Sequence, residues 1–218
     1  MDKEKIVKLT AEHVKTVMEN DSSGHDWWHA YRVWKMAVKI GKTEKKADLF
    51  VVQLGALLHD ISDWKFNGGS MDKGADIAGA WLKKIGVDEE TIGKVCDIVR
   101  NVSFRGAGVK DNMKSLEGKI VQDADRLDAI GAIGVARAFA YGGYKKRPMH
   151  RPGIKAQYHK TFEDYKNSNS TTINHFYERM LLLKDRMNTK EGRRIAAERD
   201  MRTREYLENF LKEWEEAS

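Results

Sequence analysis

The chain has 218 residues and a mass of 25.0 kDa, with 41% hydrophobic and 33% charged residues. This composition excludes an intrinsically disordered chain, and no stretch approaches the roughly 18 consecutive apolar residues that a transmembrane helix requires. The net charge of +6, from 39 Lys and Arg against 33 Asp and Glu, favours acidic partners such as nucleotides, nucleic acid or phosphorylated metabolites.

The cysteine content and the N-terminus indicate the compartment. Cys96 is the single cysteine, so an internal disulfide is excluded, and its apolar-periodic surroundings predict a buried thiol. The first five residues are charged with both signs and lack the apolar core of a signal peptide. We therefore expect a cytoplasmic protein without membrane association.

Hydrophobic periodicity is helical almost throughout the chain. The segment from about Glu44 to Asp60 is apolar on more than one face, which predicts a central helix. Thr189 is a suitable N-cap for the last helix. We find no internal repeat, low-complexity tract or convincing strand, and we predict one all-α domain. The expected helices are 6–17, 27–41, 44–60, 71–85, 88–102, 116–140, 172–187 and 190–216.

Residues 141–160 differ in composition from the rest of the chain. They contain six basic residues, no acidic residue and both prolines of the protein. A long connection without secondary structure inside a compact domain is typically a functional lid or an insert. We expect a core at about 20–140, a basic lid loop at about 141–168, and C-terminal helices at about 170–216.

The pair His59-Asp60 follows directly after the apolar run that ends at Leu58. Two adjacent side chains that bind metals, at the end of a buried segment, indicate either a metal site or a buried polar pair in which Asp60 caps a helix. Two more segments, 25–29 and 123–128, also carry imidazoles or carboxylates. A set of two His and two Asp would suit a divalent transition metal and leave coordination positions open for water and substrate.

The order of these residues matches a known pattern. The sequence H…HD…D, with the last Asp in the context Ala-Asp-x-Leu-x-Ala, resembles the HD-domain metal-dependent phosphohydrolase superfamily. The blocks 25–34, 59–66 and 123–134, with the C-terminal run 176–196, are similar to a bacterial subfamily of small, stand-alone HD hydrolases. The resemblance implies an all-α HD-domain helical bundle, here with a long basic loop and two C-terminal helices.

The resemblance also implies the metal ligands. His29 is preferred to His25, because the first ligand of the superfamily lies inside a helix; His25 then lies near the substrate or caps that helix. Asp125 is preferred to Asp123 and Asp128 because it fits the Ala-Asp-x-Leu-x-Ala register. Asp128, one turn later on the same face, is expected to orient a ligand or a water. The implied ligands are His29, His59, Asp60 and Asp125.

Some members of the superfamily have a catalytic acidic residue three positions after the HD pair. Asp63 stands there and is the candidate general base or water-orienting group, which acts beside Asp60; the alternative is an exposed turn residue. Positive and aromatic side chains near these motifs and in the basic loop are candidates for phosphate and base binding. The expected contacts to substrate are Arg32, Lys65, His25, Asp128, Lys146, Arg147 and Tyr144.

The resemblance implies hydrolysis of nucleotides. The favoured reaction converts a nucleoside or deoxynucleoside triphosphate to the monophosphate and pyrophosphate with Mn²⁺; Ni, Co, Fe, Mg or Zn are compatible. A 5′-nucleotidase and a guanosine tetraphosphate hydrolase are alternatives on the same fold. A non-catalytic module that binds nucleotides or nucleic acid is a further alternative, although it would not need open coordination positions. We expect a nucleotide substrate, no stable nucleic-acid partner, and a monomer or homodimer.

Overall fold

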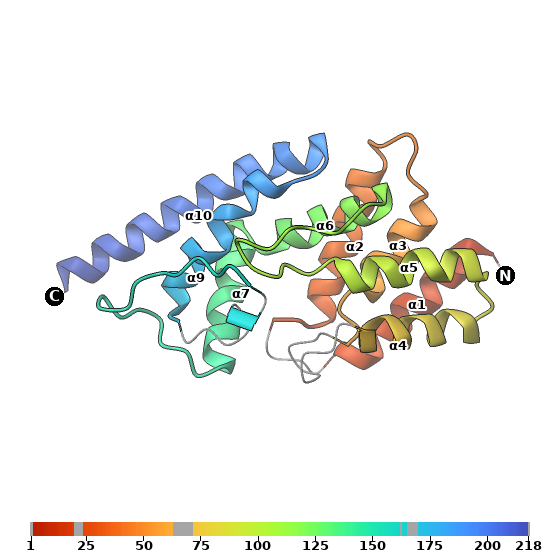
Figure 1. Ribbon diagram of the computed structural model, residues 1–218, viewed down its shortest axis with the longest axis horizontal. Coiled ribbons are helices and arrows are strands. Elements are labelled where there is room, and N and C mark those ends of the chain that lie inside the picture. The colour runs from red at the N-terminus through yellow and green to blue at the C-terminus, as the bar shows by residue number, and fades with distance from the viewer. Residues whose placement is uncertain (1, 20–23, 63–71, 162, 165–169, 218) are drawn as a thin grey trace. The chain divides into compact units, whose positions relative to one another are not determined.

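The structure is a computed structural model that describes residues 2–19, 24–62, 72–161, 163–164 and 170–217. Within these ranges the regular elements are all helices, which confirms the all-α class (Figure 1). No helix in the described ranges has the length and apolar character needed to cross a bilayer.

The chain divides into two compact units. Unit 1 comprises residues 1–103 and 111–125, and unit 2 comprises residues 104–110 and 126–218. The single domain expected from the sequence stays a prediction, and each unit is described by itself.

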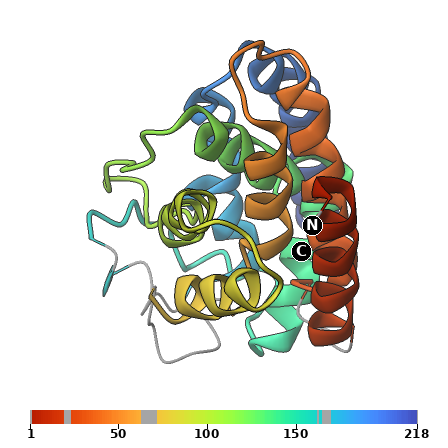
Figure 2. The same ribbon diagram turned by 90° about the vertical axis from the view of Figure 1, so that its right-hand side faces the viewer.

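Unit 1 is built around a buried helix. Eight of the ten residues of α3 (Leu49–Leu58) are buried, and α3 packs against α1 (Lys3–Met18), α2 (Trp27–Gly41) and α5 (Glu89–Asn101). Figure 2 shows α1, in red, alongside the orange helices of this unit. Gly55 permits the close approach of α5, because a Cβ atom there would lie 3.0 Å from Ile98 Cδ1. The expectation that this segment is central is confirmed.

One further helix and part of another complete unit 1. They are α4 (Asp72–Lys84), which pairs with α5, and the larger part of α6 (Leu116–Asp128). The expected irregular stretch 67–70 lies outside the described residues.

Helix α3 begins later than the sequence pattern predicted. Periodicity favoured a start near Glu44, but the first helical residue is Leu49. The side chain of Asp48 accepts a hydrogen bond from the backbone N–H of Phe50 at 2.9 Å. An N-cap carboxylate accepts a hydrogen bond from one of the unpaired backbone amides of the first turn, and so it fixes the residue at which the helix begins.

Unit 2 contains α7 (Gly131–Tyr144), α9 (Thr172–Glu178) and α10 (Lys190–Glu216). The expected continuous helix 116–140 is wrong, because α6 ends at Asp128 and a new helix begins at Gly131, which has a φ of +75°. The Gly131 N–H donates to Thr203 Oγ1 at 2.7 Å, so a contact with α10 stabilises the break.

The last two helices were predicted with different success. The expected helix 172–187 is also wrong, since α9 is followed by the short 3₁₀ turns η2 (Met180–Leu182) and η3 (Lys184–Arg186). The last helix has the predicted bounds, and Thr189 Oγ1 accepts from Gly192 N as its N-cap.

The basic segment begins later than predicted and is anchored. Residues 141–144 belong to α7, so the loop starts at Lys145. Pro148 O and Met149 O accept hydrogen bonds from the first residues of α9, at 3.0 and 2.9 Å. Ile154 O accepts from the Asn174 amide at 2.8 Å, and Gln157 N donates to Glu178 at 3.0 Å. The segment is therefore held against α9 at several points along its length.

Candidate metal centre

His29 is positioned by the start of α2. Asp26 has extended backbone geometry, and its Oδ1 accepts from the backbone N–H of His29 at 2.9 Å. This bond fixes the first turn of the helix. The His29 side chain projects from that turn into unit 1 and is completely buried.

His59 is positioned by the end of α3. It is the C-cap residue, with φ −55° and ψ −35°. Its Nδ1 lies 2.8 Å from the carbonyl oxygen of Ala56. A carbonyl only accepts, so Nδ1 donates its proton to it, and Nε2 faces the opposite side of the ring.

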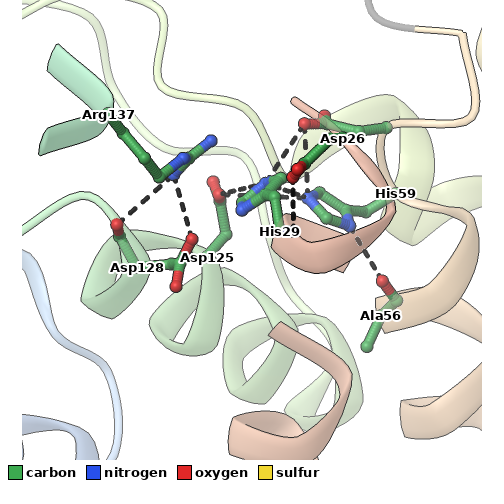
Figure 3. A network of polar contacts seen from close by, with 8 residues as sticks. Asp26, His29, Ala56, His59, Asp125, Asp128 and Arg137 are labelled. Atoms are coloured by element: carbon green, nitrogen blue, oxygen red, sulfur yellow. Dashed lines mark hydrogen bonds and ion pairs between the residues drawn. The ribbon is translucent and has the colours of Figure 1, made fainter. Parts of the chain in front are cut away.

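Two carboxylates meet these two rings, and Figure 3 shows Asp125 pointing toward His29 and His59. His29 Nε2 lies 3.2 Å from His59 Nε2. Asp60 Oδ2 lies 3.3 Å from His29 Nε2 and 3.5 Å from His59 Nε2. Asp125 Oδ1, from α6, lies 3.6 and 3.9 Å from the same two nitrogens. One ligand atom each from His29, His59 and Asp125 lies within 4.8 Å of the others.

This arrangement fits a divalent cation. Nε2 of His59 faces Nε2 of His29 and two carboxylate oxygens, so four electron-rich atoms are buried together. A divalent cation among them would compensate for the burial of the two carboxylates. Two imidazole nitrogens and two carboxylate oxygens form a donor set of intermediate hardness, which suits a divalent transition metal.

The pKa of the Asp60 carboxyl is lowered by its surroundings. Burial by itself raises the pKa of Asp60, but His59 attracts its negative charge, and a hydrogen bond from His29 and the charges of His25 and His29 act in the same direction. Together they hold the pKa well below its ordinary value near 3.8. Asp60 therefore remains an anion, which is the form that binds a cation.

The neighbouring acidic residues on α6 lie differently. Asp123 is fully buried, and because it is two residues before Asp125 it projects from another side of the helix. Asp128 forms an ion pair with Arg137, at 3.2 Å from Oδ2 to Nη1, and Arg137 also donates to its carbonyl oxygen at 3.3 Å. The carboxylate of Asp128 is thus held by an arginine of unit 2, and its role at the substrate stays a prediction.

The other residues predicted from the sequence fall into three groups. His25 lies beside the first ligand, with its ring 5.8 Å from that of His29, and Arg32 follows His29 by three residues on α2. Tyr144, Lys146 and Arg147 lie in unit 2 at the end of α7. The candidates Asp63 and Lys65 lie outside the described residues.

The alternative that His25 caps α2 is wrong, because Asp26 is the cap. Sequence reasoning missed this role, although an Asp three residues before the first ligand is an N-cap signal. It also missed the carbonyl of Ala56, which orients His59. No side-chain pattern reports on a backbone acceptor, so this contact required the structure.

Comparisons with known proteins identify the family. The model of the HD domain matches residues 27–130, the range that contains all four converging side chains. The YpgQ protein of Bacillus subtilis is 38% identical over 187 residues, which are 85% of this chain and 82% of YpgQ. The crystal structure of YpgQ in complex with ADP has a TM-score of 0.72 and 33% identity, and covers 95% of this chain and 97% of YpgQ.

Two further crystal structures are similar over almost the whole chain. A Lactobacillus plantarum protein has a TM-score of 0.88 and 33% identity, covering 98% of this chain and 99% of that protein. An HD-superfamily hydrolase from Bacillus thuringiensis has a TM-score of 0.73 and 39% identity, with the same coverage of 98% and 99%. With the two histidines and two aspartates in the order and arrangement described above, these matches show that the chain belongs to the HD-domain superfamily of hydrolases.

Proposed function

We propose that the protein is a metal-dependent hydrolase of nucleotides that cleaves nucleoside or deoxynucleoside triphosphates to monophosphates and pyrophosphate. The observation that carries the proposal is the convergence of His29, His59, Asp60 and Asp125, whose ligand atoms include two Nε2 atoms only 3.2 Å apart. We assign these four residues as the metal ligands. Mn²⁺ is the preferred ion, because mixed nitrogen and oxygen ligation suits it and it binds phosphate oxygens readily.

The bound metal would lower the pKa of a water and polarise a phosphoryl oxygen. The protein's own contribution is to hold the two imidazole ligands in place, which α2 does through the Asp26 cap and α3 through the His59–Ala56 hydrogen bond. The water oxygen forms a bond to the α-phosphorus as the bond from this phosphorus to the bridging oxygen breaks. Pyrophosphate leaves, and Asp63 takes the proton of the attacking water.

Three observations support a nucleotide as the substrate. YpgQ, at 38% identity, has been crystallised with ADP. The chain has a surplus of six positive charges, and Arg32 follows a proposed ligand by one helical turn. Lys146 and Arg147 follow Tyr144, which ends α7 and has an exposed ring, by two and three residues in the chain. This segment offers cations for phosphates and a ring for a base.

The test is a nucleotide panel assayed with Mn²⁺, Co²⁺, Ni²⁺ and Mg²⁺, in which release of phosphate is measured separately from release of pyrophosphate. We expect pyrophosphate from triphosphates and no turnover after chelation. Phosphate released only from monophosphates would indicate a 5′-nucleotidase, and turnover only of guanosine tetraphosphate would indicate the corresponding hydrolase. Binding without turnover with any of the metals would contradict an enzymatic role.

A further inference from the structure

A groove lies in unit 1, between α1 and the beginnings of α2 and α3. Its volume is about 590 Å³, within the roughly 300–1,000 Å³ typical of sites for small molecules. All of its lining residues belong to residues 3–53, so the groove is contained within unit 1. Apolar surface in the groove comes from Val7, Ala11 and Phe50.

Two indole rings from α2 line the groove. Trp27 and Trp34 are seven residues apart, which places them on one face of the helix at about 10 Å along its axis. The Tyr31 ring lies between them, with centroids 5.8 Å from that of Trp27 and 6.0 Å from that of Trp34. Flat aromatic walls of this kind bind other flat rings by stacking or edge contact.

Gln53 adds a directional polar group to these walls. Trp34 Nε1 donates to Gln53 Oε1 at 3.1 Å. An indole N–H only donates, so this bond fixes which end of the amide is the oxygen. The two N–H donors of the Gln53 amide are then available to an acceptor on the edge of a ligand ring.

The charged residues that line this groove do not favour a ligand of either sign. Lys3, Lys8 and Lys15 line it together with Glu4, Glu12 and Asp48, so both signs are present in equal number. Asp48 already accepts from Phe50 N as the cap of α3. Recognition in this groove must therefore come from the ring surfaces and the amide, and the partner need not carry a phosphate.

The groove is separate from the metal centre. His29 is two residues after Trp27 and five before Trp34, which puts its side chain about 140–200° around the helix from the two indoles. Consistent with this, His29 is buried against α3 and α6 residues, whereas Trp27 and Trp34 line the open groove.

We propose that this groove binds the planar heteroaromatic ring of a purine nucleoside, independently of the metal centre. A purine offers large faces to Trp27 and Trp34 and nitrogen acceptors on its edge to the Gln53 amide. A ligand of this size also matches the volume of the groove. The proposal does not depend on the hydrolytic function proposed above.

The test is calorimetric titration of adenosine and guanosine into the protein in the presence of a chelator, so that the metal centre does not contribute. We expect saturable binding of at least one of the two, and affinities of adenosine and adenosine monophosphate within about threefold of each other. Trp34→Leu should weaken binding by roughly tenfold, as loss of a base-stacking ring does in other proteins.

Two more variants make the test specific. Gln53→Glu keeps an acceptor for Trp34 Nε1 but removes the amide donors, so it should weaken purine binding while the protein remains folded. Trp28→Leu is the matched control: Trp28 lies on the same helix, is 59% exposed and does not line the groove, so binding should be unchanged.

Four results would overturn the proposal: no saturable binding of either nucleoside at millimolar concentration, binding of the monophosphate alone, equal binding by wild type and Gln53→Glu, or loss of binding in Asp60→Ala. The last result would place the ring at the metal centre. If Trp34→Leu does not fold, the isosteric Gln53→Glu decides the matter.

Discussion

The His59 ring donates its Nδ1 proton to the carbonyl oxygen of Ala56 at 2.8 Å, three residues earlier in the chain. A backbone acceptor inside the buried helix α3 thus fixes the orientation of this imidazole. As a result Nε2 points to the position where His29, Asp60 and Asp125 meet. In metal sites such a partner raises the basicity of the histidine and holds it in the ligating geometry.

Asp60→Ala should abolish both metal retention and activity. The carboxylate lies within 3.5 Å of both histidine nitrogens, and its removal leaves the cation with one anionic ligand fewer. We expect metal affinity to fall by roughly 100-fold or more, since even loss of an outer partner of a ligand costs 10–100-fold. Metal content after dialysis, measured by mass spectrometry, and the rate of turnover are the two measurements.

The control is Asp76→Ala, which removes an exposed carboxylate on α4 and should change neither metal content nor turnover. Retention of metal or of activity by Asp60→Ala would refute the assignment of Asp60 as a ligand.

Asp26→Ala should destabilise the start of α2. Its side chain accepts from the backbone N–H of His29 at 2.9 Å, and loss of an N-cap costs about 1 kcal/mol. We expect that decrease in the free energy of unfolding in urea, with weaker metal binding because the first turn carries His29. Asp26→Asn retains a capping oxygen and should change the free energy of unfolding by a few tenths of a kcal/mol at most. Equal stability of the Ala and Asn variants would show that the cap is unimportant.

Lys146→Gly should stabilise the protein. Lys146 has a φ of +53° and occupies the position after α7 where Gly is preferred: its N–H donates to Gly143 O, and Arg147 N–H donates to Gly142 O. A side chain in this left-handed conformation costs about 1 kcal/mol relative to Gly, so the free energy of unfolding should rise by about that amount. Lys145→Gly is the control, because Lys145 has a φ of −82° and gains nothing from Gly. A lower stability of Lys146→Gly would contradict this account.

The double variant Lys146→Glu and Arg147→Glu should raise the KM for a triphosphate. If these cations contact the phosphates, reversal of both charges replaces attraction by repulsion, and we expect an increase of roughly tenfold or more. Steady-state kinetics at several salt concentrations measures the effect, which salt should reduce. Lys212→Glu makes a charge reversal on the exposed face of α10 and should leave the KM unchanged. An unchanged KM in the double variant would remove these residues from the substrate site.

His13 should make stability depend on pH. Its ring stacks on Trp81 at 3.8 Å, and burial, followed by the positive charge of Lys84, lowers its pKa in the folded protein from 6.5. The unfolded chain therefore binds the proton more tightly than the folded protein. The contribution of neutral His13 to the free energy of unfolding is complete above pH 6.5, and it decreases as the pH falls below the pKa that His13 has in the unfolded chain.

His13→Phe keeps an aromatic ring at this position but has no group that binds a proton. Between pH 7.5 and 5.5, with a chelator present, the free energy of unfolding of this variant should therefore fall less than that of wild type. Parallel pH profiles would contradict the lowered pKa.

Much of the helical architecture followed from local signals in the sequence. The last helix has both of its predicted bounds, because the Thr189 cap and a long amphipathic pattern are contained within the helix itself. The central position of α3 followed from its apolar composition. In contrast, the helix break before Gly131 was not predicted, since the small residues around it continue a helical pattern and the contact that stabilises the break comes from Thr203, 72 residues away.

The metal centre shows the same division. The identity of His29, His59, Asp60 and Asp125 as candidates came from the sequence, because imidazoles and carboxylates in this order resemble the HD pattern. That their ligand atoms meet was decided by the tertiary arrangement of α2, the end of α3 and α6, which brings together residues up to 96 positions apart. The orientation of His59, the Asp26 cap and the indole-lined groove also depended on the tertiary structure. Short-range preferences of the backbone and of hydrophobic periodicity are encoded locally, whereas the direction of a side chain depends on every helix packed around it.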